Sequence, residues 1–157
     1  MRVLSLLVAS LVLLSACGGG EDELVAAPGF SLATIRVEGQ GKAFELDVEV
    51  AADPAARQQG LMFRRDLRDG RGMLFVYPVA SAGGHWMKDT YLPLDIAYAD
   101  DSGSVFEVVQ GKPLDTTVLT ASAPFRYVLE VPEGWFARNG LSAGARLALP
   151  ADLPVAR

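Results

Sequence analysis

The sequence predicts a single, mainly β domain: an antiparallel β-sandwich or an open barrel with one or two short helices. Apolar and polar side chains alternate over 44–50, which is typical of a half-buried strand. Other short apolar or alternating runs follow, separated by glycine, proline and aspartate turns. Helical patterns are confined to two brief stretches. We place the domain at 31–150 and a tail at 151–157.

The first two expected strands form a hairpin. In the second of them the apolar face consists of Phe44, Leu46, Val48 and Val50. A partner strand is expected at 32–37, because the intervening segment 39–42, Gly-Gln-Gly-Lys, is suited to a tight turn.

A short helix follows this hairpin. Asp53 is suited to cap its start, Pro54 to occupy the first helical position and Gly60 to end it. After the helix, the apolar run at 72–77 predicts a buried strand that stops at Pro78.

The second half of the chain contains the remaining elements. Strands are expected at 84–89, 94–99, 105–109, 125–131 and 146–149. A turn at 100–103 precedes the third of these strands. A helix of one or two turns is expected after Pro132, ending at Gly140, with Trp135 and Phe136 closing one end of the core.

Residues 1–16 are expected to be a cleaved export signal. Arg2 precedes an apolar run at 3–14, which is shorter than the roughly 20 residues needed to span a bilayer. The segment Leu14-Ser15-Ala16-Cys17 resembles the lipobox of bacterial lipoproteins, where the cysteine receives a diacylglycerol and becomes the new N-terminus. Cys17 is the only cysteine, so no disulfide within the chain is expected. The alternative is an ordinary signal peptide that ends near a cysteine by chance.

Residues 17–30 are expected to form a flexible tether. Three glycines at 18–20 and the acidic run at 21–23 favour a solvated, extended segment. Acyl chains on Cys17 would bind the membrane. The residue after the cysteine is Gly18 rather than Asp, which resembles lipoproteins released to the outer membrane. We therefore expect an exported protein that, in a Gram-negative cell, is anchored on the periplasmic side of the outer membrane. Anchoring in the inner membrane is the alternative.

Composition narrows the possible partners and reactions. The formal net charge of −5 argues against nucleic acid, whose phosphates require a basic surface. A serine hydrolase needs a histidine base beside its nucleophile, but no expected strand runs into a helix through a G-x-S-x-G turn that could place a serine beside the only histidine. A conventional serine hydrolase is therefore disfavoured. No cofactor is expected, because the part of the chain after the leader and tether contains no phosphate-cradling glycine loop.

Five segments, in order, carry a resemblance to a known family. They are GLMFRRDL at 60–67, GMLFVYP at 72–78, WMKDTYLPLDI at 86–96, YVLEVPEG at 127–134 and NGLSAG at 139–144. Together they resemble the domain-of-unknown-function 192 family. The resemblance implies a mostly antiparallel β domain that is often exported and has no established biochemical activity. The chain departs from the family at Asp89, where Asn is usual, at His85, where an aromatic residue is usual, and at 110–125, where many members carry cysteines.

The densest polar cluster is the candidate ligand-binding site. If 84–90 is extended, Trp86, Lys88 and Thr90 share one face of the strand. A tryptophan beside a cation and a hydroxyl is a plausible platform for a small anionic ligand. Arg64, or its neighbour Arg65, is expected to add a carboxylate contact. Asp95 is expected to lie either in a shallow cavity or on an exposed face of the sheet. The alternative is purely structural: Trp86 in the core and an Asp–Arg pair.

We therefore expect an envelope lipoprotein that acts as a non-enzymatic binding module for a small ligand or a partner. One alternative is an enzyme with Lys88 and Asp95 as an acid–base pair, although a structural ion pair between them is favoured over catalysis. Another is an assembly or interaction protein with an apolar patch around Trp135 and Phe136. A copper site at His85 and Met87 is a weaker alternative, because methionines in apolar runs ordinarily fill the core.

Overall fold

The computed structural model describes residues 25–154 and 156–157, and it confirms the predicted fold class. One sheet has seven strands in the order β6-β5-β8-β3-β2-β1-β9. Their bounds are β1 Ser31–Gly39, β2 Lys42–Ala51, β3 Arg71–Ser81, β5 Leu94–Ala99, β6 Val105–Gly111, β8 Phe125–Pro132 and β9 Arg146–Ala148. A second sheet pairs β4 (Gly84–His85) with β7 (Leu119–Thr120), and the helices are α1 (Pro54–Gln59) and α2 (Trp135–Arg138).

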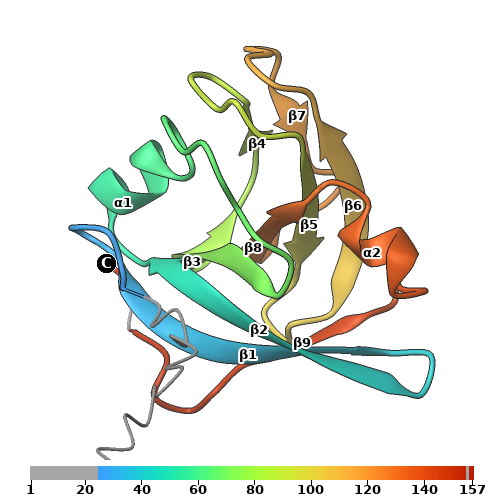
Figure 1. Cartoon of the computed structure of the whole chain (residues 1–157). Helices are drawn as coiled ribbons and strands as arrows, with labels where there is room; N and C mark the ends of the chain where they lie inside the picture. Colours follow the sequence, from blue (N-terminus) through green and yellow to red (C-terminus); the bar gives the residue numbers. More distant parts are fainter. Residues whose placement is uncertain (1–24, 155) are drawn as a thin grey trace, which may run out of the picture.

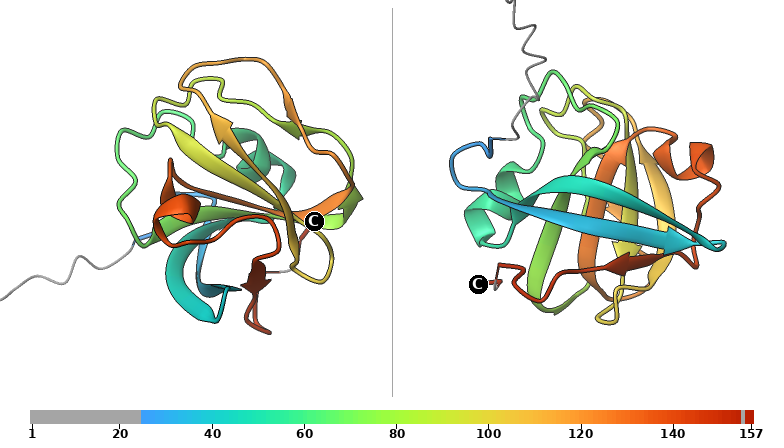
Figure 2. Two further views of the ribbon diagram at one scale, coloured as in Figure 1. Left: turned by 90° about the vertical axis from the view of Figure 1, so that its right-hand side faces the viewer. Right: turned by 60° about the horizontal axis from the view of Figure 1, so that its bottom comes forward.

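The large sheet curls until its two edges nearly meet (Figure 1). The right-hand view of Figure 2 shows β1 and β2 running across the direction of β8 and β5. At the closing end, an isolated bridge joins Ser104 to Arg146, and the backbone N–H of Val105 donates to the carbonyl of Ala145 at 2.8 Å. The molecule is therefore an open barrel rather than two separate stacked sheets.

The predicted hairpin is confirmed, with strands slightly longer than expected. β1 and β2 pair from Ser31–Val50 to Gly39–Lys42, which leaves Gln40 and Gly41 as the turn. Both turn residues have positive φ, 52° and 71°, as the tight turns that match strand twist require. One pair departs from the antiparallel expectation: β2 and β3 are parallel. Parallel neighbours need a crossover, and α1 with the segment after it provides one.

The caps of α1 are those that the sequence predicts. The side chain of Asp53 accepts a hydrogen bond from the N–H of Ala56 at 2.9 Å, and Pro54 begins the helix. Gly60 ends it with φ of 48°. A Cβ at Gly60 would lie 3.1 Å from the ring of Phe75, a tight contact that adds to the strain any side chain would have at this positive φ.

Two apolar clusters use opposite faces of the central strands. The barrel core, inside the curl, draws side chains from all the long strands and from Trp135 and Phe136 of α2. The outer core lies on the other face of β3, β5 and β8 beneath α1, and it includes Ala56, Phe75 and Tyr98. Every residue of β5 is buried because this strand lies between the two clusters. Among the described residues, no helix is long and apolar enough to cross a membrane.

Two local expectations were wrong. The strand expected at 84–89 ends at His85, because the chain turns at Lys88 and Asp89, where φ of Asp89 is 53°. β3 continues past Pro78 to Ser81; the register with β8 shifts between Val76 and Ser81, so the missing N–H of Pro78 breaks no regular ladder. The same shift places Phe125 in the outer core, whereas Tyr127, Leu129 and Val131 of the same strand face the barrel core.

Candidate functional site

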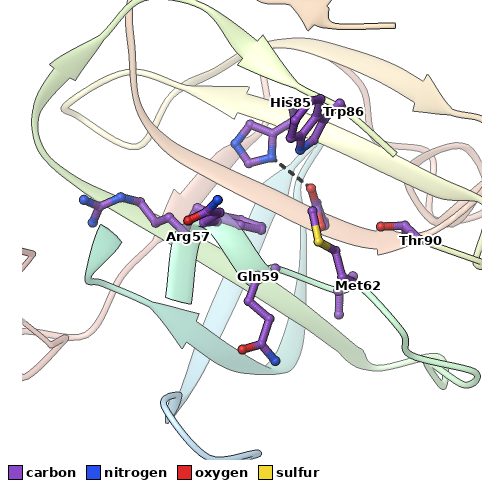
Figure 3. A pocket seen from close by; sticks show the side chains of 11 residues that line it. Arg57, Gln59, Met62, His85, Trp86 and Thr90 are labelled. Carbon is purple, nitrogen blue, oxygen red and sulfur yellow. Dashed lines mark hydrogen bonds and ion pairs between the residues drawn. The ribbon is translucent and has the colours of Figure 1, made fainter. Parts of the chain in front are cut away.

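A buried histidine–glutamate pair lies at the centre of the candidate site. Nδ1 of His85, on β4, lies 2.9 Å from Oε1 of Glu130, on β8 (Figure 3). The two residues are only 9% and 4% exposed. Because a carboxylate only accepts hydrogen bonds, the proton between them belongs to Nδ1. This bond fixes the orientation of the imidazole.

Tyr77 completes a chain of three polar groups. Its hydroxyl lies 3.2 Å from Nε2 of His85. With Nδ1 protonated, a neutral imidazole accepts at Nε2, so the phenol donates. Burial raises the pKa of Tyr77; the guanidinium of Arg57, 5.0 Å from the ring centre, lowers it, and Glu130 raises it further. The net upward shift keeps the phenol protonated in its donor role.

A second tyrosine holds the backbone of the histidine. The N–H of His85 donates to the hydroxyl of Tyr98 at 3.0 Å, and that hydroxyl donates to the carbonyl of Leu119 at 2.5 Å. Burial raises the pKa of Tyr98 to about 12. The ring edge of His85 also packs against Phe75, with centres 4.5 Å apart. β4 is short, but these contacts make the position of His85 well defined.

A small pocket opens beside this pair, between α1 and the segment after β4. Its lining includes Gln59, Met62, Trp86, Thr90 and Glu130 (Figure 3). The free space is about 30 Å³, far below the roughly 300–1,000 Å³ typical of sites for drug-sized ligands. A pocket of this size admits a few waters or the end group of a larger molecule.

One carboxylate oxygen of Glu130 faces this pocket. Oε1 is bonded to His85, whereas no hydrogen bond of the described residues uses Oε2. The described part of the chain also contains no fully buried side-chain oxygen or nitrogen that lacks a partner. Oε2 therefore reaches the open space of the pocket and is available as an acceptor.

The structure brings Trp86, Lys88 and Thr90 together, but not on one exposed face. Trp86 is 44% exposed, and Nζ of Lys88 lies 5.6 Å from its ring centre. Thr90 is buried, and its hydroxyl donates to the carbonyl of Lys88 at 3.2 Å. The face-sharing expectation fails because the chain turns at Lys88 and Asp89. Trp86 and Thr90 line the pocket; Lys88 covers the tryptophan.

Arg64 and Asp95 serve other purposes. Arg64 pairs with Glu49 at 2.5 Å. Asp95 is 3% exposed and accepts from the N–H groups of Gly134 and Phe136, so it fixes the start of α2. Among the described residues, no ion pair joins Lys88 to Asp95, and neither the expected acid–base pair nor the expected structural pair forms. Because Asp95 is buried, it does not lie on an exposed face of the sheet.

The remaining candidates lie in packed surroundings. Met87 is 1% exposed within the outer core, and both ring nitrogens of His85 already have partners. In the described ranges, no group of three His, Cys, Asp or Glu side chains is placed to hold a metal ion. Trp135 and Phe136 are buried in the barrel core, so they present no apolar patch. Cys17 and residues 1–16 lie outside the described residues.

Sequence reasoning missed the two partners of His85. Glu130 is the single charged residue in the apolar run from Tyr127 to Val131, a signal that it needs a buried partner. Tyr77 is the one residue with a polar group in the run from Gly72 to Tyr77 of β3, so its hydroxyl also needs a partner. Nothing in the local pattern pairs either one with His85, because Glu130 lies 45 residues away along the chain.

The structure is thus a small, curled β domain with a buried polar pair beside a shallow pocket. The model of the DUF192 family, described as an uncharacterized ACR, matches residues 34–149. The chain belongs to this family. That finding confirms the family resemblance of the five sequence segments.

Two solved structures are similar to this chain. One is a Sinorhizobium meliloti protein provisionally described as a transcription regulator, with 33% identity and a TM-score of 0.76 over 79% of this chain and 98% of that one. The other is a protein of unknown function from Novosphingobium aromaticivorans, with 30% identity and a TM-score of 0.75 over 79% of this chain and 89% of that one. No curated protein matches the chain.

Proposed function

We propose that this protein is an envelope lipoprotein whose domain binds a protonated amino group at the end of a small ligand, in the pocket above Glu130. The observation that carries the proposal is the second carboxylate oxygen, Oε2, which faces the pocket without a partner among the described residues. A carboxylate attracts a cationic donor, and low exposure strengthens that attraction relative to water.

The walls of the pocket also suit an ammonium group. Trp86 and Met62 provide an aromatic ring and a polarizable thioether at the opening. Gln59 adds an amide that accepts or donates. The nearest cation in the lining, Arg57, directs its guanidinium to the carbonyls of Ala52, Val76 and Arg157. It therefore does not neutralise Glu130 directly. This charge balance reverses the initial expectation of an anionic ligand.

Thermal unfolding with defined probes tests this proposal. Putrescine and ethanolamine should raise the unfolding temperature, because a molecule that binds only the folded state stabilises it; acetate should not. Glu130→Gln keeps an oxygen for His85 but removes the charge, so it should abolish the stabilisation. Glu133→Gln, at an exposed position just beyond β8, is the matched control. Equal stabilisation of wild type and Glu130→Gln by putrescine would refute amine binding at this site.

The envelope part of the proposal rests on the lipobox-like segment ending at Cys17. We expect a protein that lacks residues 1–16, carries acyl chains on Cys17 and lies at the periplasmic side of the outer membrane. Mass spectrometry of the protein purified from its native cells tests this expectation. An unmodified thiol with residues 1–16 still attached would contradict it, and the result is independent of the amine experiment.

An enzymatic function is the second candidate. A histidine oriented by a carboxylate is the arrangement of many general bases. Here, however, Nε2 of His85 is held by Tyr77 and the ring is 9% exposed, so the geometry supports binding over proton transfer to a substrate. The relative from Sinorhizobium meliloti is provisionally described as a transcription regulator. The net charge of −5 argues against DNA binding by this chain.

A further inference from the structure

Four exposed apolar side chains gather on three neighbouring loops, and we call them the apolar rim. They are Phe63, Trp86, Tyr91 and Leu114, with exposed fractions of 63%, 44%, 36% and 54%. The N–H of Phe63 donates to the carbonyl of Asp89 at 2.8 Å, and that of Leu114 donates to the carbonyl of Thr90 at 3.0 Å. These bonds hold the three loops side by side, so the four side chains lie on adjoining loops.

The outward placement of the rim is built into strained backbone. Phe63 and Leu114 have φ of 65° and 63°, and Asp89 between their loops has φ of 53°. Bulky residues rarely adopt this left-handed conformation, because Cβ crowds the following carbonyl. Strain of this kind persists at sites of function, where the surrounding contacts hold it in place. Here it turns two large apolar side chains toward solvent.

Two aromatic rings of the rim, those of Tyr91 and Trp86, each have a positively charged side chain nearby. The guanidinium of Arg65 lies 4.2 Å from the ring centre of Tyr91, and Nζ of Lys88 lies 5.6 Å from that of Trp86. Within the described part of the chain, no carboxylate pairs with Arg65 or Lys88. Tryptophan and tyrosine concentrate at the boundary between lipid and water, where lysine and arginine extend toward the headgroups.

Two polar contacts link the start of the described chain to the loop that carries Phe63. The N–H of Ala27 donates to Oε1 of Glu49 at 2.7 Å, and Oε2 of Glu49 pairs with Arg64, the neighbour of Phe63. Seven residues, 18–24, lie between Cys17 and Val25. Fully extended, such a segment spans at most roughly 30 Å. An anchor at Cys17 therefore holds Val25, the first described residue, within roughly 30 Å of the bilayer surface.

We propose that the apolar rim inserts into the interface of the bilayer that anchors the protein. This inference rests on the lipid anchor of the proposed function, because four side chains alone bind a membrane weakly. The short tether makes insertion an intramolecular event at high effective concentration. The rim then orients the domain, with the pocket lined by Trp86 opening beside the lipid surface.

Trp86 itself reports on insertion. The chain has two tryptophans, and Trp135 is buried in the barrel core, so the difference between wild type and Trp86→Phe isolates the emission of Trp86. The chain from Cys17 to Arg157 contains every described strand and helix. It is coupled through Cys17, its only cysteine, to a maleimide phospholipid in vesicles of phosphatidylcholine and phosphatidylglycerol. Phospholipids brominated near the headgroup should then quench Trp86 and leave Trp135 unchanged.

Matched variants identify the surface responsible. Phe63→Ser with Leu114→Ser should abolish the quenching, whereas Leu32→Ser, at an exposed position on β1, should not. Far-ultraviolet circular dichroism confirms that each variant is folded. The inference is overturned if bromolipid leaves Trp86 unquenched. This holds also if iodide, a quencher dissolved in the water, fails to reach Trp86, because a second copy or another protein would then cover the rim. Chemical coupling supplies the anchor whether or not cells acylate Cys17, so failure here is distinct from failure of the lipoprotein proposal.

Discussion

The carboxylate of Asp95 accepts a hydrogen bond from the backbone N–H of Phe136 at 3.1 Å, although the two residues lie 41 positions apart. The second oxygen accepts from the N–H of Gly134 at 3.0 Å. A buried strand residue thus caps a helix that has no side-chain cap of its own. This contact holds α2, with Trp135 and Phe136, over the end of the barrel core.

Asp95→Ala should therefore destabilise the fold. It leaves the buried N–H of Phe136 and the partly buried N–H of Gly134 without an acceptor, and loss of hydrogen bonds to a charged group costs about 1.5–3 kcal/mol. Urea unfolding followed by tryptophan fluorescence measures the change. Asp101→Ala, at an exposed turn position, should lie within about 0.5 kcal/mol of wild type. If the two variants were equally stable, the capping role of Asp95 would be wrong.

Tyr98 should make the protein sensitive to alkaline pH. Burial raises its pKa in the folded state from 10.0 to about 12. The phenol thus contributes its full stability below pH 10, and this contribution is lost as pH rises through about 12. Unfolding free energies measured across this range should fall less steeply in Tyr98→Phe. A slope unchanged by the substitution would show that other groups govern alkaline unfolding.

Tyr98→Phe should also loosen the small sheet at neutral pH. The hydroxyl links the N–H of His85 to the carbonyl of Leu119, and these residues pair across β4 and β7. Hydrogen exchange at the amide of His85 should become faster, with a stability loss of about 1–3 kcal/mol. Unchanged protection at His85 would contradict the role assigned to the hydroxyl.

Gly60→Ala should destabilise the fold by about 1–3 kcal/mol. Its φ of 48° disfavours any side chain, and the new Cβ would meet the ring of Phe75 at 3.1 Å. Gly70→Ala is the matched control, because Gly70 has φ of 81° but no atom within 4 Å of the added carbon. We expect Gly60→Ala to lose more unfolding free energy than Gly70→Ala, because only the Cβ at position 60 meets a neighbouring atom. A larger cost at Gly70 would show that backbone strain alone dominates.

Arg57→Ala should loosen the C-terminal end of the chain. The guanidinium donates to the carbonyls of Ala52, Val76 and Arg157 at 2.8–2.9 Å, and no other described contact joins these three segments through one side chain. We expect a loss of about 1.5–3 kcal/mol and faster carboxypeptidase trimming. Arg57→Lys, which keeps the charge but not the planar fork, should recover only part of the loss. Trimming at the wild-type rate would argue against this role.

Local patterns were sufficient for most individual elements. The alternation at 44–50 predicted β2, and Asp53 and Pro54 predicted the start of α1, because strand periodicity and helix caps depend on residues close in sequence. The burial of Trp135 and Phe136 was expected for the same reason. The family was also visible in five ordered segments of the chain.

The candidate site was much less predictable. His85, Trp86 and Thr90 were identified, yet the extended strand expected through them ends at a left-handed turn that a non-glycine residue, Asp89, adopts. Asp95 was expected to bind a ligand or to pair with Lys88, but its partners are backbone groups at the start of a distant helix. Side-chain type indicated that these residues are unusual without indicating what each one contacts.

The sequence by itself determined the strand and helix preferences, the acidic balance, the lone cysteine and the family, since each depends on composition or on neighbours in the chain. Only the tertiary structure decided that Glu130 and Tyr77 meet at His85, and that the loops of Phe63 and Leu114 share one surface. The physical reason is that curling and register bring distant segments together. A residue's charge or apolarity is local, but the partner that satisfies it is set by the fold.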